Sequence, residues 1–597
     1  MFLQRTPLKS IIGSMKELRS LSKYFYKYRG RFALGILFVL ASNWFKVQQP
    51  QIIREALDLV NTKVQNNDTS DLGHTLLWYG ALVLIYSLFM GLFMFLMRQM
   101  LIVNSRLIER DLRNDIYKHY QTLHQDFYRQ NKTGDLMSRV VEDVGKVRMF
   151  LGPGVLYTVN LIGIFGSVLA TMIWINPRLA FWTVLPLPIL SISIYFVSRL
   201  INKRSELVQR KLSELTVMAQ ETFSGMRVVK SYAQEKWISK RFYALADDYK
   251  NASVHLTLAD ALFFPLMLLL IGSSTLLTVY FGGQQTIEGT ATAGNIAEFV
   301  LYVNMLSWPF TAIGWIASMT QNAEASQKRI NEFLKTQSEI YDLQPDTVAL
   351  NPRGAIEFRN VSFTYKNSGI EALKKLNFTI NPSERIAIIG RTGSGKTTVA
   401  DLLLRMYDPV EGRIYLDGHD LKQLPLKQLR SIMGYVPQDV FLFSETAINN
   451  IRFPNESIED SKAKEMADYA AIKTELESLP EGFNTLVGER GVMLSGGQKQ
   501  RISIARALIK NPDVLILDDC LSAVDAHTEK RISESLNKLC QGKITFIITS
   551  RLYATLQFDK IMVINDGQIE DFGRPDELLG RNAYYTELMA NYASAQV

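Results

Sequence analysis

Residues 386–397 read IAIIGRTGSGKT, and this stretch decides the fold of the second half of the 597-residue chain. Its apolar start is typical of a buried strand, and a glycine-rich turn then leads to Lys396 and Thr397. Glycines let backbone N–H groups curl around phosphate oxygens, a lysine supplies positive charge, and a threonine hydroxyl can bind Mg²⁺. The stretch therefore predicts a strand, a phosphate-binding turn and a helix, which alone indicates only some nucleotide-binding protein.

Two further stretches narrow this prediction. Val514–Asp518 is apolar up to its last residue, as expected for a buried strand whose terminal carboxylate holds Mg²⁺ through water. Residues 494–498 read LSGGQ. The order of the three stretches resembles the ATP-binding cassette of the ABC transporter family, over residues 354–590. The resemblance implies an α/β P-loop nucleotide-binding domain with a helical subdomain, which binds and hydrolyses ATP with Mg²⁺.

The resemblance also implies roles for single residues. Tyr365 resembles the aromatic residue that stacks on adenine, and Thr397, Gln438 and Asp518 form the implied Mg²⁺ site. In such cassettes Ser495 begins a helix whose positive end faces the γ-phosphate bound by the opposite subunit. The implied nucleotide contacts are Tyr365, Gly390, Arg391, Thr392, Gly393, Ser394, Gly395, Lys396, Thr397, Thr398, Ser495, Gly496, Gly497 and Gln498.

Two positions depart from the family pattern at one site. Asp519 stands where the family normally has the glutamate that polarises the attacking water, and its side chain is one methylene shorter. Ser550, within the switch-like segment 547–552, stands in place of the usual histidine beside the γ-phosphate. The implied catalytic set of Asp519, Ser550 and Gln438 is therefore degenerate, and we expect little hydrolysis there. The alternative, that Asp519 is tolerated variation at a working base, stays open.

The first half of the chain has the composition of a membrane domain. Hydrophobic residues make up 47% of the chain and charged residues 21%, and the apolar content is concentrated before residue 325. Six segments have roughly the ~20 residues that cross a bilayer. They are 32–54, 75–97, 151–175, 178–200, 259–281 and 294–318. By resemblance they form an all-α, six-helix exporter domain of type IV fold over residues 1–340, followed by the nucleotide-binding domain over residues 341–597.

The charge distribution predicts the orientation. Lys and Arg cluster before the first span and in segments 98–150 and 203–258, whereas the connection 282–294 carries none. The positive-inside rule then places the N-terminus, both long segments and the nucleotide-binding domain in the cytoplasm of a multi-pass cell-membrane protein. The first span is expected to be an uncleaved anchor, and residues 11–28 an amphipathic helix on the inner leaflet. The net charge of +8 follows from this bias and needs no nucleic-acid partner.

Two cytosolic segments, 126–136 and 221–232, resemble the coupling helices of ABC exporters. In that family the second one usually reaches across to the other subunit's cassette, so a dimer of two halves is implied. The alternative is that both segments are solvated helical hairpins.

The membrane segments say less about the cargo. Lys46 lies midway along the first span, where a charge costs about 2.5–3.5 kcal/mol on insertion scales, so we expect it to face the bundle or a wet cavity. Lys46 then either meets an anionic group of the cargo or has a structural role beside a carbonyl or an acidic residue. Aromatic and methionine residues of the spans suit a broad apolar cavity, lipid contact or simple packing.

The whole pattern resembles the degenerate-site subunit of a heterodimeric bacterial multidrug exporter. Such a half-transporter needs a second exporter half as partner and moves amphipathic or hydrophobic compounds through the lipid bilayer with ATP. Two alternatives stay open: a homodimeric lipid or peptide exporter in which Asp519 works at both sites, and an ATP-gated regulatory or channel subunit. The intact signature and the coupling segments argue against a purely regulatory role.

Overall fold

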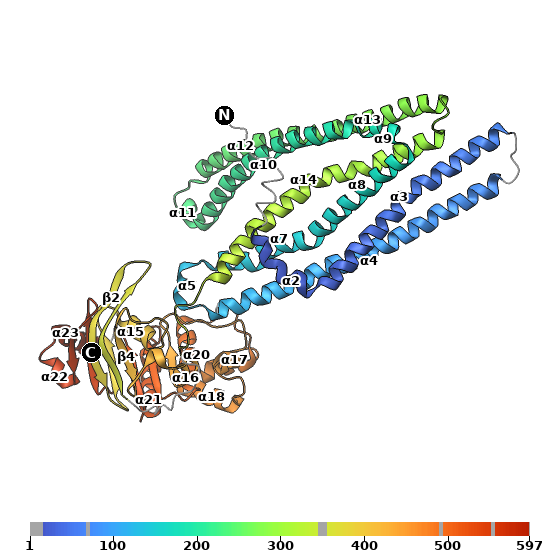
Figure 1. The fold of residues 1–597 in the computed structure, drawn as a ribbon. Helices are drawn as coiled ribbons and strands as arrows, with labels where there is room; N and C mark the ends of the chain where they lie inside the picture. The colour runs from blue at the N-terminus through green and yellow to red at the C-terminus, as the bar shows by residue number, and fades with distance from the viewer. Residues whose placement is uncertain (1–15, 67–71, 344–354, 489–493, 551–555, 596–597) are drawn as a thin grey trace. The chain divides into compact units, whose positions relative to one another are not determined.

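The chain folds into two compact units (Figure 1). The computed structural model describes residues 16–66, 72–343, 355–488, 494–550 and 556–595. The first unit takes in the chain up to Gln121 and Gly134–Thr336, and the second takes in Thr122–Thr133 and the chain from Gln337 onward. A short excursion between two predicted spans thus belongs to the same unit as the cassette. The domain boundary at residue 340 stays a prediction.

The second unit is built on two sheets. A six-stranded sheet has the strand order β10-β9-β3-β8-β7-β6, in which only β10 is antiparallel, and a four-stranded antiparallel sheet has the order β2-β1-β4-β5. The strands are β1 Ile356–Tyr365, β2 Ile370–Ile380, β3 Arg385–Ile389, β4 Glu411–Leu416, β5 His419–Asp420, β6 Met433–Val436, β7 Val514–Asp518, β8 Ile544–Ile548, β9 Lys560–Asn565 and β10 Gln568–Gly573. The predicted α/β fold is confirmed.

Helices cover these sheets and form a second apolar core. They are α5 Gln125–Gln130, α15 Lys396–Leu403, η4 Leu421–Gln423, α16 Leu426–Ser431, α17 Ala447–Arg452, α18 Asp460–Tyr469, α19 Lys473–Glu477, η5 Gly482–Asn484, α20 Gly496–Leu508, α21 Ala526–Leu539, α22 Pro575–Leu579 and α23 Ala583–Ala595. Helices α17, α18 and α20 pack together around buried Ile448, Met466 and Ile502. This cluster is the helical subdomain that the sequence predicted.

The first unit is all helical. Six stretches are long and apolar enough to cross a membrane: Arg29–Gln65, Leu72–Thr122, Thr133–Ile175, Pro177–Ser224, Glu235–Ile287 and Ala293–Lys335. Each contains one predicted span, so the prediction of six spans is confirmed. The 51-residue helix of the second stretch is about 75 Å long at ~1.5 Å per residue, against ~30 Å of hydrocarbon. The helices therefore extend well beyond the thickness of a bilayer.

Several of these stretches are composed of shorter elements. The helices of the first unit are η1 Glu17–Leu21, α2 Ser22–Lys27, α3 Arg29–Gln65, α4 Leu72–Thr122, α6 Thr133–Ser138, η2 Arg139–Asp143, α7 Val144–Met149, η3 Phe150–Gly154, α8 Val155–Ile175, α9 Pro177–Val184, α10 Pro186–Ser224, α11 Met226–Ser231, α12 Glu235–Ala261, α13 Phe263–Ile287 and α14 Ala293–Lys335. Both η2 and η3 are π-helical turns, and η3 contains Pro153. A proline removes a backbone donor, which accounts for local widening at η3.

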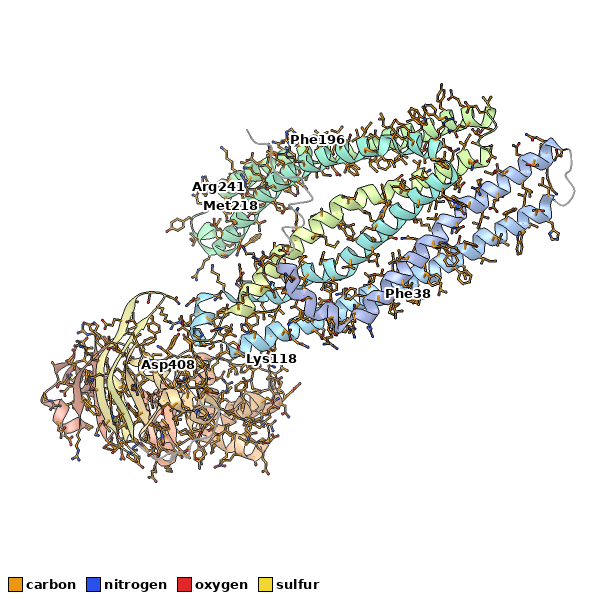
Figure 2. All side chains as sticks on the ribbon, viewed as in Figure 1. Phe38, Lys118, Phe196, Met218, Arg241 and Asp408 are labelled. Atoms are coloured by element: carbon orange, nitrogen blue, oxygen red, sulfur yellow. The ribbon has the colours of Figure 1, made fainter. Side chains whose placement is uncertain are left out.

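Helix α14 supplies the centre of this unit. Its Phe299, Tyr302 and Leu306 are fully buried and belong to one apolar cluster with side chains of α8, α9 and α13. On the outside of the unit, large apolar side chains such as Phe196, which is 62% exposed, project away from the ribbon (Figure 2). An apolar exterior around a packed interior is what a lipid-embedded bundle requires.

The N-terminal segment packs more closely against the unit than the sequence indicated. The expected amphipathic helix at residues 11–28 lies partly outside the described residues, and the described part forms η1 and α2. Lys23 and Tyr24 both donate to the Asp115 carboxylate of α4, at 2.8 and 2.7 Å. One turn earlier along α4, a second aspartate holds the next Lys-Tyr pair. Paired polar contacts therefore fasten this segment to α4, in addition to any lipid contact.

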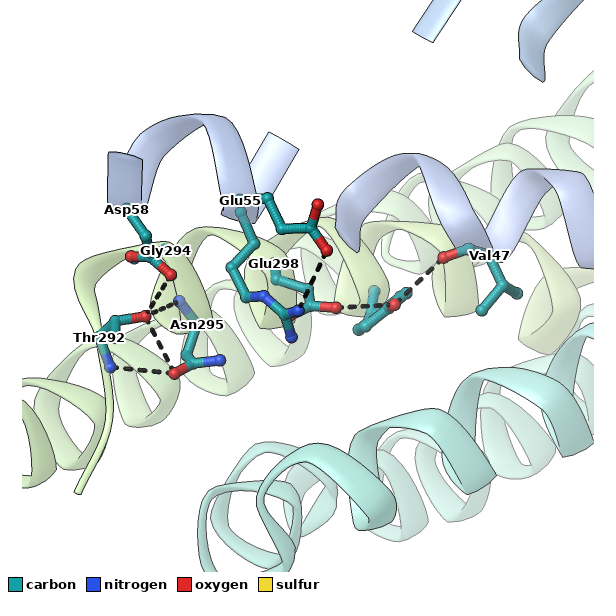
Figure 3. Close-up of polar contacts among 9 residues, drawn as sticks. Val47, Glu55, Asp58, Thr292, Gly294, Asn295 and Glu298 are labelled. Atoms are coloured by element: carbon teal, nitrogen blue, oxygen red, sulfur yellow. Dashed lines mark hydrogen bonds and ion pairs between the residues drawn. The ribbon is translucent and has the colours of Figure 1, made fainter. Parts of the chain in front are cut away.

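A network of charged and polar groups joins α3 to α14 (Figure 3). The Glu298 carboxylate is fully buried and accepts from Arg54 Nη1 at 3.1 Å. Tyr302 Oη lies 3.0 Å from Glu298 Oε1 and 3.1 Å from the carbonyl oxygen of Val47. Nearby on α3, Asp58 accepts from the backbone and hydroxyl groups that begin α14. Burial of a carboxylate is tolerated here because each of its oxygens has a donor.

We expect Glu298→Ala to lower the thermal unfolding midpoint of the purified protein. Removing one partner of a buried pair costs about 3–5 kcal/mol, and the partial exposure of Arg54 favours the lower end. Glu55→Ala is the matched control, because Glu55 is 55% exposed and lies 3.8 Å from the same guanidinium. Equal midpoints for the two variants would contradict a stabilising role of the network.

Candidate nucleotide-binding site

The order of three parallel strands brings the site together. Strand β8 lies between β3 and β7, and Ile548 of β8 is in register with Ile388 on one side and with Asp518 on the other. Their carboxyl ends therefore lie side by side at one edge of the sheet. The phosphate loop follows β3, Ser550 comes shortly after β8, and Asp518 ends β7 with Asp519 directly after it. Ligands of open parallel sheets bind at this edge.

The phosphate loop is closed around its lysine. Lys396 begins α15, and its Nζ donates to the carbonyl oxygens of Gly390 and Arg391, both at 2.8 Å. Burial lowers the pKa of Lys396, although the neighbouring carboxylates oppose this change. A half-buried cation at a helix N-terminus, lining a cavity, is an environment that favours a bound phosphate.

The site opens into a cavity of about 620 Å³. Of the residues that the sequence singled out, the cavity is lined by Tyr365, Thr392, Gly393, Gly395, Lys396, Thr397, Thr398, Gln438, Asp518, Asp519 and Ser550. Gly390, Arg391 and Ser394 belong to the same loop but are not among the lining residues. The volume and the polar groups along one wall suit a nucleotide.

Asp518 has the surroundings of a metal ligand. Burial, with the Asp519 charge as a smaller cause, raises the pKa of Asp518 to about 6, while a hydrogen bond from Thr397 opposes the rise. Its Oδ2 is buried without a hydrogen-bond partner among the described residues. A bound cation would satisfy this oxygen. Within the same described part, no three His, Cys, Asp or Glu side chains gather as a metal cage. Mg²⁺ fits such a site because it is held by one or two protein groups together with phosphate oxygens and water.

The two unusual residues are both at the cavity. Asp519 has a left-handed backbone with a φ of +46°, and its N–H donates to the Ile548 carbonyl at 2.8 Å. A non-glycine residue in this region is uncommon, and here it marks the sharp turn of the chain directly after β7. Ser550 is exposed and lines the same cavity. Residues 551 and 552 of the predicted switch lie outside the described residues.

The signature lies apart from this cavity. Ser495 and Gln498 form a reciprocal capping box at the start of α20, with hydrogen bonds of 2.8 and 3.2 Å. Gln498 and Arg501 both bind Glu475, which anchors the turn. None of the four predicted signature contacts, Ser495, Gly496, Gly497 and Gln498, is among the described residues that line the cavity. The structure of one chain therefore does not bring the two halves of the predicted nucleotide site together.

The sequence missed one wall of the cavity. Asp126 and Arg129 of α5 line it, as does Asn367 in the β1–β2 turn. The resemblance to a coupling helix located the first segment, but nothing in the pattern said which side chains reach a nucleotide. Lys46 in α3 is partly exposed, and among the described residues no carboxylate pairs with it, so both of its predicted roles stay open.

Comparison with known proteins decides the family. Residues 32–310 match the family model described as ABC transporter transmembrane region, and residues 373–522 match the model described as ABC transporter. The probable multidrug resistance ABC transporter ATP-binding/permease protein YheI of Bacillus subtilis is 35% identical over 571 residues, which cover 96% of each chain. The chain belongs to the ABC transporter family.

Other ABC transporters are similar over nearly the whole length. The multidrug resistance-like ATP-binding protein MdlA of Escherichia coli is 32% identical over 96% of each chain. An ATP-dependent lipid A-core flippase of Pseudomonas fluorescens is 32% identical over 85% of this chain and 84% of its own. A bacterial Atm1-family ABC exporter with ATP bound has a TM-score of 0.77 and 26% identity, covering 95% of this chain and 98% of that one. This ABC exporter thus has the type IV fold, and its cassette is an ATPase coupled to transport.

Two glycines of the phosphate loop give a matched test of its geometry. Gly395 and Gly393 both have left-handed backbones, with φ of +101° and +83°. A Cβ on Gly395 would lie 2.4 Å from the Ala372 carbonyl oxygen, whereas a Cβ on Gly393 meets nothing within 4 Å. We expect both alanine variants to carry about 1–2 kcal/mol of backbone strain, and Gly395→Ala about 1–3 kcal/mol more from the clash. Thermal unfolding of the purified exporter measures the difference, and equal midpoints would show that the β2 contact is not rigid.

Proposed function

We propose that this chain is one subunit of a heterodimeric ABC exporter, with a degenerate ATP site on its own Walker motifs. The observation that carries the proposal is the pair Asp519 and Ser550 at one cavity. An aspartate has one methylene less reach than glutamate, and a serine hydroxyl lacks the ring nitrogens through which a histidine donates or accepts protons. A positioned general base contributes about 10²–10⁴-fold to a rate, so this site binds ATP and hydrolyses it slowly.

The signature sequence of the cassette is intact, and this supports a role for it in the nucleotide site of a second subunit. The signature helix presents exposed Ser495 and Gly496 at its N-terminus, away from the chain's own cavity. A helix N-terminus attracts phosphate through its free N–H groups and dipole. We assign this end of α20 to the γ-phosphate of a nucleotide that is bound by the second subunit, whose site has the competent base.

The second coupling segment also supports a two-chain assembly. Helix α11 has no buried residue, and on its flanks Phe223 is 74% exposed and Tyr232 is 73% exposed. Large exposed apolar side chains on a cytosolic loop mark a contact surface. We propose that the partner's cassette covers them, with the N-terminus and both cassettes in the cytoplasm.

Within the chain's own site, we propose that Thr397, Gln438 and Asp518 hold Mg²⁺ and that Tyr365 stacks on adenine. Mg²⁺ would neutralise phosphate charge there. Lys396 supplies the positive charge at the phosphates, and Thr392, Gly393 and Gly395 shape the loop. These contacts need no general base, so ATP affinity survives where hydrolysis is slow.

For the cargo, we propose amphipathic or hydrophobic compounds. Two of the relatives carry multidrug resistance in their names and a third is a lipid A-core flippase. In the first unit, Phe45 of α3 stacks on Phe89 and Phe93 of α4. Aromatic surfaces without a dense set of polar groups recognise shape and apolarity rather than one ligand. A homodimeric lipid or peptide exporter is the competing function, and it requires Asp519 to act as the base in both sites.

Co-expression tests the heterodimer directly. We expect this chain alone to show ATPase activity on the order of 10²-fold or more below that of the pair formed with a second half-transporter that has glutamate after its Walker B aspartate. Both preparations are purified in lipid nanodiscs and assayed with and without apolar drugs. If the single chain forms a dimer that turns over as fast as the pair, the homodimeric function is correct.

Two substitutions in this chain test the division of labour between the sites. We expect Ser495→Ala to reduce the ATPase rate of the pair on the order of 10²-fold, because it removes a donor to the reacting phosphate in the partner's site. Asp519→Asn should leave the rate nearly unchanged. Since Ser495 also caps α20, the thermal midpoint is measured beside the rate, and capping alone accounts for about 1 kcal/mol. Equal losses in the two variants would identify Asp519 as a working base.

A further inference from the structure

The cavity that takes the nucleotide has one wall from a loop of the membrane-spanning half. Residues 122–133, which connect α4 to α6, form a compact unit with the cassette. Their docking rests on specific contacts. Asp126 and Phe127 of α5 are each 8% exposed, and Asn367 Nδ2 donates to Asp126 Oδ1 at 3.3 Å. The backbone N–H of Glu339 donates to His124 Nδ1 at 3.2 Å. The loop is therefore seated firmly enough to position a side chain.

Arg129 is that side chain. The central carbon of its guanidinium lies 4.9 Å from the centroid of the Tyr365 ring, within the range of a cation–π contact. Its Nη1 donates to Tyr407 Oη at 3.2 Å. Burial raises the pKa of Tyr407, so this hydroxyl keeps its proton at neutral pH and accepts from the guanidinium as a neutral group. Arg129 and Tyr365 line the same cavity.

Tyr365 is held on three sides. Besides the guanidinium, its hydroxyl lies 3.0 Å from Thr398 Oγ1 on α15, and its ring is perpendicular to the rings of Phe363 and Tyr407. An aromatic platform loses less entropy on stacking when its ring is already fixed in place. Of these contacts, the guanidinium is the only one that comes from outside residues 337–597, as far as the described residues show.

We propose that Arg129 is a positioning residue for the adenine base: it fixes the Tyr365 platform, so that base binding and docking of α5 support each other. Phosphate binding is independent of it, because the phosphates rest on the loop after β3. Thermodynamic linkage makes this effect reciprocal. If docked Arg129 strengthens ATP binding by a given factor, bound ATP strengthens the docking of α5 by the same factor. The docking of residues 122–133 is then sensitive to the adenine base of the nucleotide and not to its phosphates.

The test compares a ligand with a base to one without. ATP and inorganic tripolyphosphate, each with Mg²⁺, are titrated into the assembled full-length transporter in which this chain supplies the only intact phosphate loop. We expect Arg129→Ala to weaken ATP binding about three- to tenfold, as a cation–π contact of this exposure allows, and to leave tripolyphosphate binding unchanged. Arg129→Lys should retain part of the affinity. Lys132→Ala is the matched control, because it removes one positive charge from the same loop at an exposed residue outside the cavity lining.

A second readout separates positioning from a merely structural role. In the Tyr365→Ala background, Arg129→Ala should have no further effect on ATP affinity, since the platform is gone. Hydrogen exchange of residues 122–133 should slow with ATP and not with tripolyphosphate, and this difference should disappear in Arg129→Ala. An equal loss for both ligands, additive effects of the two substitutions, or tighter ATP binding without Arg129 would each overturn the proposal. None of these readouts depends on the cargo or on which chain hydrolyses ATP, so they stand apart from the test of the heterodimer.

Discussion

The burial of parallel strands on both faces is the constraint on which the nucleotide site depends. Strands β3, β7 and β8 consist almost entirely of apolar side chains with no exposed face, so they are stable only inside a sheet that is covered by helices. Polar residues are then excluded from the strands and appear where the strands end. The phosphate loop, the Asp518–Asp519 pair and Ser550 are neighbours for this reason. The polar side chains of the site are concentrated at one edge of the sheet because the interior of the sheet is apolar.

The same constraint explains how much of the site the sequence could predict. Apolar runs that end in a glycine loop or a carboxylate are local patterns, so β3, β7 and the loop between β3 and α15 were correctly anticipated from the residues. The six membrane stretches were also predictable, because a hydrophobic run of sufficient length leaves few alternatives in a chain with this composition. The full lengths of the helices were less predictable, since the parts beyond each apolar run carry more charged residues and have no comparable signal.

Long-range partners lay beyond sequence reasoning. Nothing around Glu298 indicated that Arg54, more than two hundred residues earlier, would neutralise it, and nothing around Asp115 indicated its Lys-Tyr partners in α2. The position of Arg129 over Tyr365 depends on the docking of the short helix α5, and the resemblance of residues 126–136 to a coupling helix did not indicate which side chain it would contact. Such contacts are fixed by tertiary packing, and a single sequence contains no periodicity that reports them. Asp519 lies between these two cases. The sequence showed that an aspartate replaces the usual glutamate, whereas only the structure showed its left-handed backbone.

The assignment of residues 122–133 to the cassette unit has a consequence for the synthesis of the protein. This loop leaves the ribosome about two hundred residues before the first strand that it contacts. At roughly 5–20 residues per second, Asp126 and Arg129 wait on the order of 10–40 s before their partners Asn367, Tyr365 and Tyr407 have been synthesised. Residues 122–133 can therefore gain their contacts with the cassette only after residues 134–336 have been synthesised. The second unit is completed late for this reason, although its first residues are made early.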